Sequence, residues 1–284
     1  MQHVLSIQSW VAYGHVGNAA AVFPLQRLGC EVWSIHTVQF SNHTGYGQWK
    51  GRVLDAAFVQ EVFEGIRDRG VLPQCDAVLS GYLGDASTGE AVLSAVRAVK
   101  QANPAALYCC DPVMGDAGRG FFVRDGIPAF FRDQVVPHAD ILTPNHFELE
   151  YLAGKPVTHL ADGIAAARSL VTRGPRWVLV TSFRREGADP HAIEMLLVSA
   201  TEAWLVATPK LALQVNGTGD LMAALFLGHF LQERDVEKAL ARATSGIFGV
   251  LSHTAHTGAR EMQLIAAQQE LTTPSISFVP VSVA

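Results

Sequence analysis

Residues 215–231, VNGTGDLMAALFLGHFL, join a glycine-rich turn to an almost wholly apolar helix. A helix that is apolar on all sides is normally buried, so this segment predicts the centre of a large core. A core helix does not need Gly217, Thr218 and Gly219 at its start, or the carboxylate of Asp220 directly after them. These residues let several backbone N–H groups point into one small space, with the positive end of the helix dipole behind them. The turn therefore predicts an anion hole, and Asp220 is the candidate for the residue that accepts a proton from an attacking hydroxyl.

An anion hole beside a proton acceptor is typical of phosphoryl transfer to an alcohol. The backbone amides would hold the moving phosphoryl group, and Asp220 would take the proton of the hydroxyl. A purely structural interpretation stays open, in which Gly217 and Gly219 form a tight turn and Asp220 stabilises the first turn of the helix.

Three further acidic residues bear on this choice, because Asp111, Asp116 and Glu148 occur in motifs that contain no lysine. Carboxylates close to the phosphates of a nucleotide require cations between them, typically Mg²⁺ held by one or two carboxylates together with phosphate oxygens and water. Each acid alone would also suit a solvated loop or a helix cap. Together with the glycine-rich turn, they favour a site for a nucleotide and its metal ion.

Length, composition and charge limit the kinds of protein that this chain can be. Its 284 residues, 49% of them hydrophobic, suffice for one large domain, and no repeat or linker divides them, so we expect a single domain over residues 1–284. A net charge of −5 without a block of Lys or Arg argues against nucleic-acid binding. The longest apolar run, residues 221–227, is too short to span a membrane, and the N-terminal MQHVLSIQSW lacks the regions of a signal peptide. The cysteines show no metal spacing and indicate reduced thiols in a cytoplasmic protein; they are Cys30, Cys75, Cys109 and Cys110.

Strand-like and helical patterns alternate along most of the chain. Such alternation predicts an α/β fold, with a mostly parallel sheet covered by helices on both faces. Asn18 is expected to cap the first helix, and Ser87 or Thr88 the helix that runs to about residue 99. The expected strands are residues 4–7, 31–38, 76–80, 105–110, 139–142 and 177–180, followed by an antiparallel pair at 194–198 and 203–206. The expected helices are residues 19–28, 56–69, 88–99, 162–172, 218–232, 235–253 and 259–271.

Polar and glycine residues follow the expected strands at the points where the strands end. Ligands of open α/β sheets bind beyond the carboxyl ends of the strands, so we expect these residues to meet at one rim of the sheet. They are Ser9, His43, Thr44 and Gly45, Tyr82, Asp111 and Asp116, Asn145 and Glu148, and Thr181 and Ser182.

The segments that carry these residues resemble those of the pyridoxal kinases of the ribokinase-like superfamily. The likeness covers nearly the whole chain and includes IQSWVAYGHVGNAAAVFPLQRLG, TVQFSNHTGYGQWKG, DAVLSGYLG, CDPVMGDAGRG, LTPNHFELEYLAG and NGTGD. GTGD is common to the superfamily, whereas QFSNHTGYG and SGYLG are specific to the pyridoxal-binding side in that family. The resemblance implies a ribokinase-like fold and ATP-dependent phosphorylation of the 5′-hydroxymethyl group of pyridoxal, and of pyridoxine or pyridoxamine, in vitamin B6 salvage.

The resemblance also implies roles for individual residues. Asp220 would deprotonate the hydroxymethyl group beside the anion hole, and Asp116 and Glu148 would organise Mg²⁺, directly or through water. Phe122 would cover the nucleotide as a lid, and family members are typically homodimers. The substrate would contact Ser9, His43, Thr44, Gly45 and Tyr82. ATP would contact Asn145, Glu148 and Ser182 through its phosphates and Leu211 and Val215 through its adenine. Asp111, Thr143 and Thr181 would also bind ATP, close to its phosphates and to a monovalent cation, K⁺.

Two positions depart from the family pattern, and rival functions stay open. Trp10 stands where many relatives have His, and Thr181 stands where some bacterial relatives have Lys. The nearest rival is a hydroxymethylpyrimidine kinase, which shares DPVM and TPN but usually carries Cys at the position of Asp220. A sugar or nucleoside kinase often adds a strand lid, for which residues 10–50 offer no clear segment. A non-catalytic carrier of pyridoxal phosphate would have no use for an acid beside an anion hole.

Overall fold

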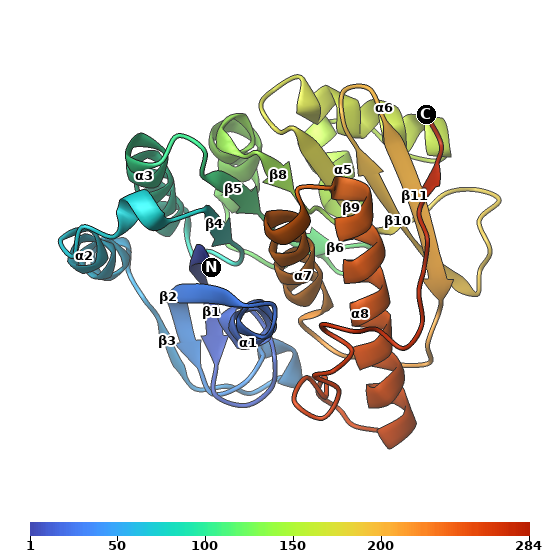
Figure 1. The fold of residues 1–284 in the computed structure, drawn as a ribbon, viewed down its shortest axis with the longest axis horizontal. Coiled ribbons are helices and arrows are strands. Elements are labelled where there is room, and N and C mark those ends of the chain that lie inside the picture. Colours follow the sequence, from blue (N-terminus) through green and yellow to red (C-terminus); the bar gives the residue numbers. More distant parts are fainter.

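One sheet of ten strands runs through the molecule, with helices packed on both of its faces (Figure 1). The computed structural model describes residues 1–284. The strands follow the order β12-β11-β10-β9-β8-β5-β4-β1-β2-β3, and a separate hairpin pairs β6 with β7. The pairs from β9 through β1 to β2 are parallel, whereas β10, β11, β12 and β3 run antiparallel to their neighbours. The expected α/β architecture with a mostly parallel sheet is therefore confirmed.

The strands are β1 Gln2–Val11, β2 Cys30–Phe40, β3 Gly51–Val53, β4 Ala77–Ser80, β5 Leu107–Cys110, β6 Gly115–Asp116, β7 Gly120–Phe121, β8 Ile141–Leu142, β9 Trp177–Phe183, β10 Ala192–Val198, β11 Ala203–Pro209 and β12 Val281–Ser282. The α-helices are α1 Asn18–Arg27, α2 Ala56–Arg67, α3 Ala86–Ala102, α4 Ile127–Phe130, α5 His146–Ala153, α6 Leu160–Val171, α7 Thr218–Glu233 and α8 Val236–Thr257.

Side chains alternate across the sheet, so its two faces have separate hydrophobic cores. Leu5 and Val78 belong to the core beneath α2, α3, α5 and α6, whereas their neighbours Val4 and Leu79 belong to the core beneath α1, α7 and α8. In Figure 1, α7 and α8 lie side by side in front of the sheet. Every residue of α7 from Leu221 to Leu231 is buried, as the apolar stretch predicts.

Two predicted helix caps are wrong. Asn18 lies inside α1, where its side chain accepts a hydrogen bond from Ser6 Oγ (2.7 Å) and donates one to the Ile35 carbonyl oxygen (3.0 Å). It therefore ties α1 to two strands instead of capping the helix. Asp85 caps α3 in place of Ser87 or Thr88, because its Oδ1 accepts the backbone N–H of Thr88 (3.0 Å).

The helix predicted for residues 259–271 is also wrong. Gly258, in the left-handed conformation at φ +63°, ends α8, and the chain continues in successive turns. One of these turns is fixed by the Gln263 N–H, which donates to Thr254 Oγ1 (3.0 Å). The turns direct Met262, Leu264 and Leu271 into the core, so the helix-like apolar spacing is satisfied without a helix.

Several short elements have no counterpart among the predictions. The strands β3, β6, β7 and β12 contain two or three residues each, too few for an alternating pattern to identify. Ser9 lies within β1, and Thr181 and Ser182 lie within β9, and not after them as expected, because both strands are longer than predicted.

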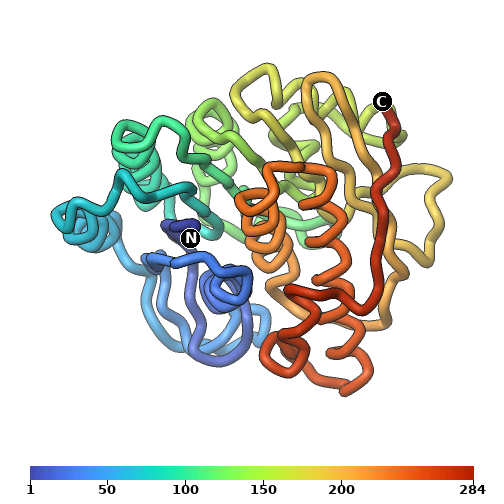
Figure 2. The backbone as a smooth tube through the Cα atoms, viewed as in Figure 1, coloured from blue at the N-terminus to red at the C-terminus, as the bar shows by residue number.

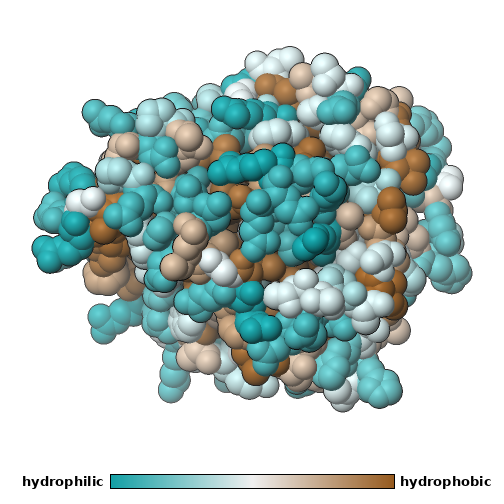
Figure 3. Space-filling view, viewed as in Figure 1, coloured by the Kyte–Doolittle hydropathy of each residue, from teal (hydrophilic) through white to brown (hydrophobic).

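All four cysteines are buried and unpaired. Burial raises the pKa of Cys30 and Cys75 to about 11. No helix combines the length and apolar character that a membrane crossing requires. On the face shown in Figure 3, hydrophilic side chains predominate and hydrophobic ones form small separate groups.

Candidate active site

The site lies at the topological switch point of the sheet. Strand β1 pairs with β2 on one side and with β4 on the other. The chain therefore runs from β1 towards one edge of the sheet through β2 and β3, and then returns to β4 on the other side of β1. A crevice forms between the carboxyl ends of strands at such a point. The register between β1 and β2 shifts between Gln8 and Trp10, which places Ser9 at an irregularity of the sheet that faces the crevice.

Two adjoining cavities occupy this rim. The first has a volume of about 460 Å³ and the second about 750 Å³. Nine residues line both cavities and mark their common boundary: Gly45, Asp116, Arg119, Thr181, Ser182, Val215, Asn216, Thr218 and Gly219. The size of the two spaces suits a small acceptor beside a larger ligand.

The structure brings nearly all predicted site residues together. Leu211 lines the second cavity, and Thr143 is buried behind Asp111 without reaching either cavity. The first cavity is lined by Ser9, His43, Thr44, Gly45, Tyr82, Asp111, Asp116, Phe122, Asn145, Glu148, Thr181, Ser182, Val215, Gly217, Thr218, Gly219 and Asp220.

The start of α7 has the geometry of an anion hole. Gly217 adopts φ +85°, and a Cβ on it would lie 1.9 Å from the His15 carbonyl oxygen, so only glycine fits there. The backbone N–H groups at the start of a helix have no partner within it. Those of the predicted Gly217, Thr218 and Gly219 lie at the cavity wall, where they can bind a developing negative charge.

Three carboxyl groups share the first cavity with this helix start. Burial raises the pKa of Asp111 well above its usual range, and the neighbouring Glu148 and Asp220 raise it further. Burial also raises the pKa of Asp220. Hydrogen bonds from the backbone N–H groups of Gly17 and of Asp220 itself lower this pKa, but burial has the larger effect. Burial raises the pKa of Glu148 to about 8. Because these acids repel one another, a cation in the cavity would be strongly favoured.

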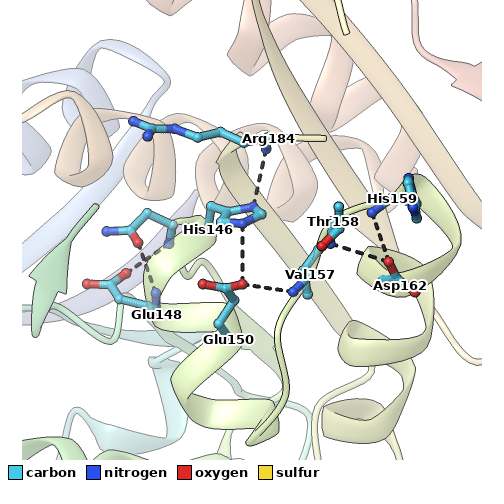
Figure 4. A network of polar contacts seen from close by, with 9 residues as sticks. His146, Glu148, Glu150, Val157, Thr158, His159, Asp162 and Arg184 are labelled. Carbon is cyan, nitrogen blue, oxygen red and sulfur yellow. Dashed lines mark hydrogen bonds and ion pairs between the residues drawn. The ribbon is translucent and has the colours of Figure 1, made fainter. Parts of the chain in front are cut away.

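Glu148 is held by a capping box at the start of α5 (Figure 4). Its Oε2 accepts the backbone N–H of Asn145 (2.8 Å), and its Oε1 accepts those of Met114 (2.9 Å) and Gly115 (3.4 Å). The Asn145 side chain in turn donates to the Gly115 carbonyl oxygen (2.8 Å). Both oxygens of Glu148 are thus engaged by the backbone, which favours contact with a metal ion through water.

No group of three His, Cys, Asp or Glu side chains is assembled as a metal site. A metal ion here would therefore take most of its ligands from phosphate oxygens and water, as Mg²⁺ does at nucleotide sites. The buried Asp111 and Glu148 and the exposed Asp116 supply the negative charge that such an ion requires. The residues present fit a cation that arrives with a nucleotide.

An apolar wall, which the sequence analysis missed, closes one side of the first cavity. Val11, Val16, Val38 and Phe40 form a small cluster against which Tyr82 packs. Val11 lies in β1, Val38 and Phe40 lie in β2, and Val16 lies in the loop after β1. In the sequence, their spacing is that of ordinary strand residues. A wall of this kind suits a flat aromatic ring.

Polar groups stand opposite this wall. Burial lowers the pKa of His43, so the ring is neutral at physiological pH. Its Nδ1 accepts the Gly45 N–H (3.1 Å), which leaves Nε2 as the donor. Trp10 does not line either cavity and packs on His36 at 4.9 Å between ring centroids, so its departure from the family pattern lies outside the site.

The boundary between the cavities carries two features that sequence reasoning missed. Arg119, at the hairpin of β6 and β7, lines both cavities and is the only cationic side chain in the first. The sequence did offer a signal for Arg119, because it is the one basic residue in the acidic motif CDPVMGDAGRG. Ser182 adopts φ +49°, an uncommon conformation for a residue other than glycine, and such backbone strain is concentrated at binding sites.

The chain resembles known proteins over its whole length. A family model described as phosphomethylpyrimidine kinase matches residues 21–264. The pyridoxal kinase PdxY of Rubrobacter xylanophilus is 60% identical over 277 residues, covering 97% of this chain and 96% of the relative. The chain belongs to the pyridoxal kinase family. The pyridoxal kinase PdxY of Deinococcus radiodurans is 56% identical over 283 residues, covering 98% of this chain and 95% of that relative.

Solved structures agree with this family and with its ribokinase-like fold. The pyridoxal kinase from Leishmania donovani in complex with ADP and pyridoxamine superposes with a TM-score of 0.93 at 31% identity, covering 100% of both chains. Its complex with ADP and pyridoxine gives the same TM-score at 32% identity, covering 99% of both chains. The family model is described by the name of the nearest rival, whereas the relatives at 56 to 60% identity are pyridoxal kinases.

Proposed function

We propose that this chain transfers the γ-phosphoryl group of ATP to the 5′-hydroxymethyl group of pyridoxal, with pyridoxine and pyridoxamine as further acceptors. The product, pyridoxal 5′-phosphate, would serve vitamin B6 salvage. The single observation that carries the proposal is the position of Asp220, beside the free N–H groups of α7 in a cavity with an apolar wall. The family relatives and the two cavities, one for each substrate, support it.

The acceptor occupies the first cavity in this mechanism. Its pyridine ring packs against Val11, Val38 and Phe40, which exclude water from one face. The polar groups of Ser9 and His43 bind the ring substituents, with His43 donating from Nε2. Thr44, Gly45 and Tyr82 complete this pocket. The arrangement leaves the hydroxymethyl group pointing towards the start of α7.

Asp220 acts as the general base. The hydroxymethyl oxygen attacks the γ-phosphorus, the new O–P bond forms as the bond to the ADP oxygen breaks, and the hydroxyl proton passes to the Asp220 carboxylate. Burial raises the pKa of Asp220, which makes the carboxylate a stronger base than an exposed one. The residue therefore combines the right position with a suitable basicity.

The transferring phosphoryl group is held by the protein on two sides. The N–H groups of Gly217, Thr218 and Gly219 face its oxygens from the start of α7. The Arg119 guanidinium, which lines both cavities, faces it from the hairpin. Positive groups on two sides stabilise the charge that spreads over the phosphoryl oxygens during transfer.

ATP occupies the second cavity, which also contains the side chains of Arg184, Lys210 and Arg260. Leu211 and Val215 border the adenine, and the phosphates extend past Thr181 and Ser182, which line both cavities, towards Asn145 and Phe122, which line the first. Asp116 and Glu148 would hold Mg²⁺, directly or through water, and Asp111, Thr143 and Thr181 would lie near a monovalent cation, K⁺. Bound Mg²⁺ supplies neutralising charge to the phosphates. The buried Thr143 hydroxyl lies beside the Asp111 carboxyl and lowers its pKa, which is consistent with a cation close to both groups.

The proposal includes three properties at the level of the whole molecule. Residues 1–284 form a single kinase domain, which the continuous ten-stranded sheet supports. The family resemblance supports a cytoplasmic homodimer. Light scattering after size-exclusion chromatography tests the dimer, with a monomer mass as the contrary result.

A coupled assay tests the proposed reaction. Pyridoxal, pyridoxine, pyridoxamine, hydroxymethylpyrimidine and ribose are offered separately with ATP and Mg²⁺. We expect turnover of pyridoxal and of at least one other vitamer, with far slower turnover of hydroxymethylpyrimidine and ribose. Preferred turnover of hydroxymethylpyrimidine would establish the nearest rival, and a protein that binds pyridoxal phosphate but not ATP would be a carrier.

A further inference from the structure

Three consecutive residues after α8 connect the loops that surround the first cavity. The segment Arg260, Glu261 and Met262 turns back from the end of α8 and lies beside the loops after β1 and β2 (Figure 2). These loops are close neighbours in space, although they are more than 200 residues away from the segment in the sequence. Of these three residues, only Arg260 has a place in the proposed chemistry, at the wall of the second cavity, and Glu261 and Met262 have none.

Glu261 binds both loops with one carboxylate. Tyr46 Oη donates to its Oε1 (2.5 Å), and the His15 backbone N–H donates to its Oε2 (3.2 Å). Gly14 adopts φ +92°, and a Cβ on it would lie 2.4 to 2.8 Å from the atoms of the carboxyl group, so the loop after β1 packs tightly against Glu261. The hydrogen bond to Glu261 raises the pKa of Tyr46 to about 12, so the hydroxyl remains a donor at physiological pH.

The residues on either side of Glu261 extend these contacts. The Arg260 guanidinium lies 5.7 Å from the ring centroid of Tyr46. Met262 is fully buried, and its Cε lies 3.0 Å from the position that a Cβ on Gly217 would take. One short segment thus touches both loops and the turn of the anion hole.

Both loops carry groups that surround the acceptor and the base. The loop after β2 carries His43, Thr44 and Gly45, which line the first cavity, and ends its short turn at Tyr46. The loop after β1 carries Gly17, whose backbone N–H faces the Asp220 carboxylate. The loop after β2 has mostly exposed residues and little core of its own to hold it.

We propose that residues 260–262 form a clasp in which Glu261 is a positioning residue for acceptor binding, holding the two loops against each other and against the start of α7. The inference rests on the proposed function, because the acceptor of the first cavity is taken to be pyridoxal. Without the carboxylate, Tyr46 and its loop lose their anchor, and the acceptor pocket formed by His43, Thr44 and Gly45 loses its fixed shape, while the second cavity is affected only where Tyr46 and Arg260 line it.

Variants of the full-length protein test the clasp. The first is Glu261→Ala, with Glu261→Gln as the conservative variant that keeps one acceptor oxygen and Tyr46→Phe as the partner change. Glu270→Ala is the matched control, because Glu270 lies further along the chain after α8 and its side chain accepts a hydrogen bond from the Ser275 backbone N–H (2.8 Å) away from both cavities. The measurements are kcat, KM for pyridoxal, KM for ATP and the melting temperature.

We expect Glu261→Ala to raise KM for pyridoxal about tenfold, the effect of losing a hydrogen bond to a charged group, and to raise KM for ATP by a smaller factor, since Tyr46 and Arg260 also line the second cavity. Glu261→Gln should recover most of this loss. Tyr46→Phe should have little additional effect in the Glu261→Ala background, because both changes remove the same contact. A KM for pyridoxal equal to that of the unaltered protein, or additive effects of the two changes, would overturn the proposal.

Hydrogen–deuterium exchange of the ligand-free protein separates this proposal from the proposed function. The clasp predicts faster exchange in residues 41–50 for Glu261→Ala but not for Glu270→Ala, whatever the acceptor of the enzyme is. Unchanged exchange in residues 41–50 would reject the clasp even if pyridoxal is the substrate. If Glu261→Ala does not fold, Tyr46→Phe gives the same two readouts with a smaller disturbance.

Discussion

Replacement of Asp220 by Asn is the perturbation with the most sharply defined outcome. Asparagine has nearly the same shape and cannot accept the hydroxyl proton. Loss of a general base usually lowers the rate about 10²- to 10⁴-fold, which corresponds to about 2.7 to 5.5 kcal/mol of transition-state stabilisation. We expect kcat to fall at least about a hundredfold, with KM for pyridoxal and for ATP nearly unchanged.

The same replacement should not destabilise the protein. Burial raises the pKa of Asp220, and its charge raises that of Asp111. A group with a raised pKa in the folded state reduces stability once the pH exceeds its unfolded value, because the charged form is then disfavoured by folding. Removing the charge at neutral pH should therefore leave the melting temperature unchanged or higher.

A coupled spectrophotometric assay and differential scanning calorimetry on the same preparation measure the two effects. An Asp220→Asn protein that retains more than about a tenth of the original kcat would refute the role of Asp220 as the base. A large fall in melting temperature would refute the electrostatic argument. Unchanged binding of pyridoxal, measured by calorimetric titration, confirms that the site is intact.

Four further predictions use the geometry of the site. Gly217→Ala should lower kcat at least about tenfold, since a Cβ would lie 1.9 Å from a backbone oxygen and the left-handed backbone would be strained. Gly187→Ala is the control, because Gly187 has φ +76° and open space around it. Equal kcat in the two variants would contradict the anion hole. Arg119→Gln should lower kcat/KM about tenfold, as expected for one charge-assisted hydrogen bond. Arg124→Gln should have no effect, because Arg124 pairs with the half-buried Asp85 at 3.8 Å and lines neither cavity. The profile of kcat against pH should fall on the acid side, because protonated Asp220 cannot act as a base; burial raises its pKa, so the midpoint should lie above the ordinary value of 3.8, and a midpoint below that value would contradict the assignment. Chelation of Mg²⁺ should abolish turnover and its readdition restore it, and full activity in excess chelator would contradict the cation argument.

The sequence predicted the rim of the site better than its walls. Polar residues after parallel strands, such as His43, Asp111 and Asn145, could be grouped because the carboxyl ends of parallel strands meet at one edge. The apolar wall around Phe40 could not be recognised, since its side chains follow ordinary strand alternation. Which apolar residue faces a cavity depends on register and on an irregularity at Ser9 that no local pattern reveals.

Local signals also failed where tertiary contacts decide the structure. Asn18 has the side chain of a helix cap, but burial between two strands gives its amide better partners. Residues 259–271 have helical spacing, yet Gly258 ends the helix and the following turns reach the same core. Glu261 gave no signal at all, because its partners Tyr46 and His15 are far away in the sequence.

The most direct measurement is a crystal structure of the enzyme with pyridoxal, Mg²⁺ and a non-hydrolysable ATP analogue. We predict that the 5′-oxygen of pyridoxal lies within about 2.6 to 3.2 Å of an Asp220 carboxylate oxygen, with the γ-phosphoryl group against the N–H groups at the start of α7. A structure in which Asp220 points away from the hydroxymethyl group, or in which the phosphates bind elsewhere than the helix start, would contradict the account.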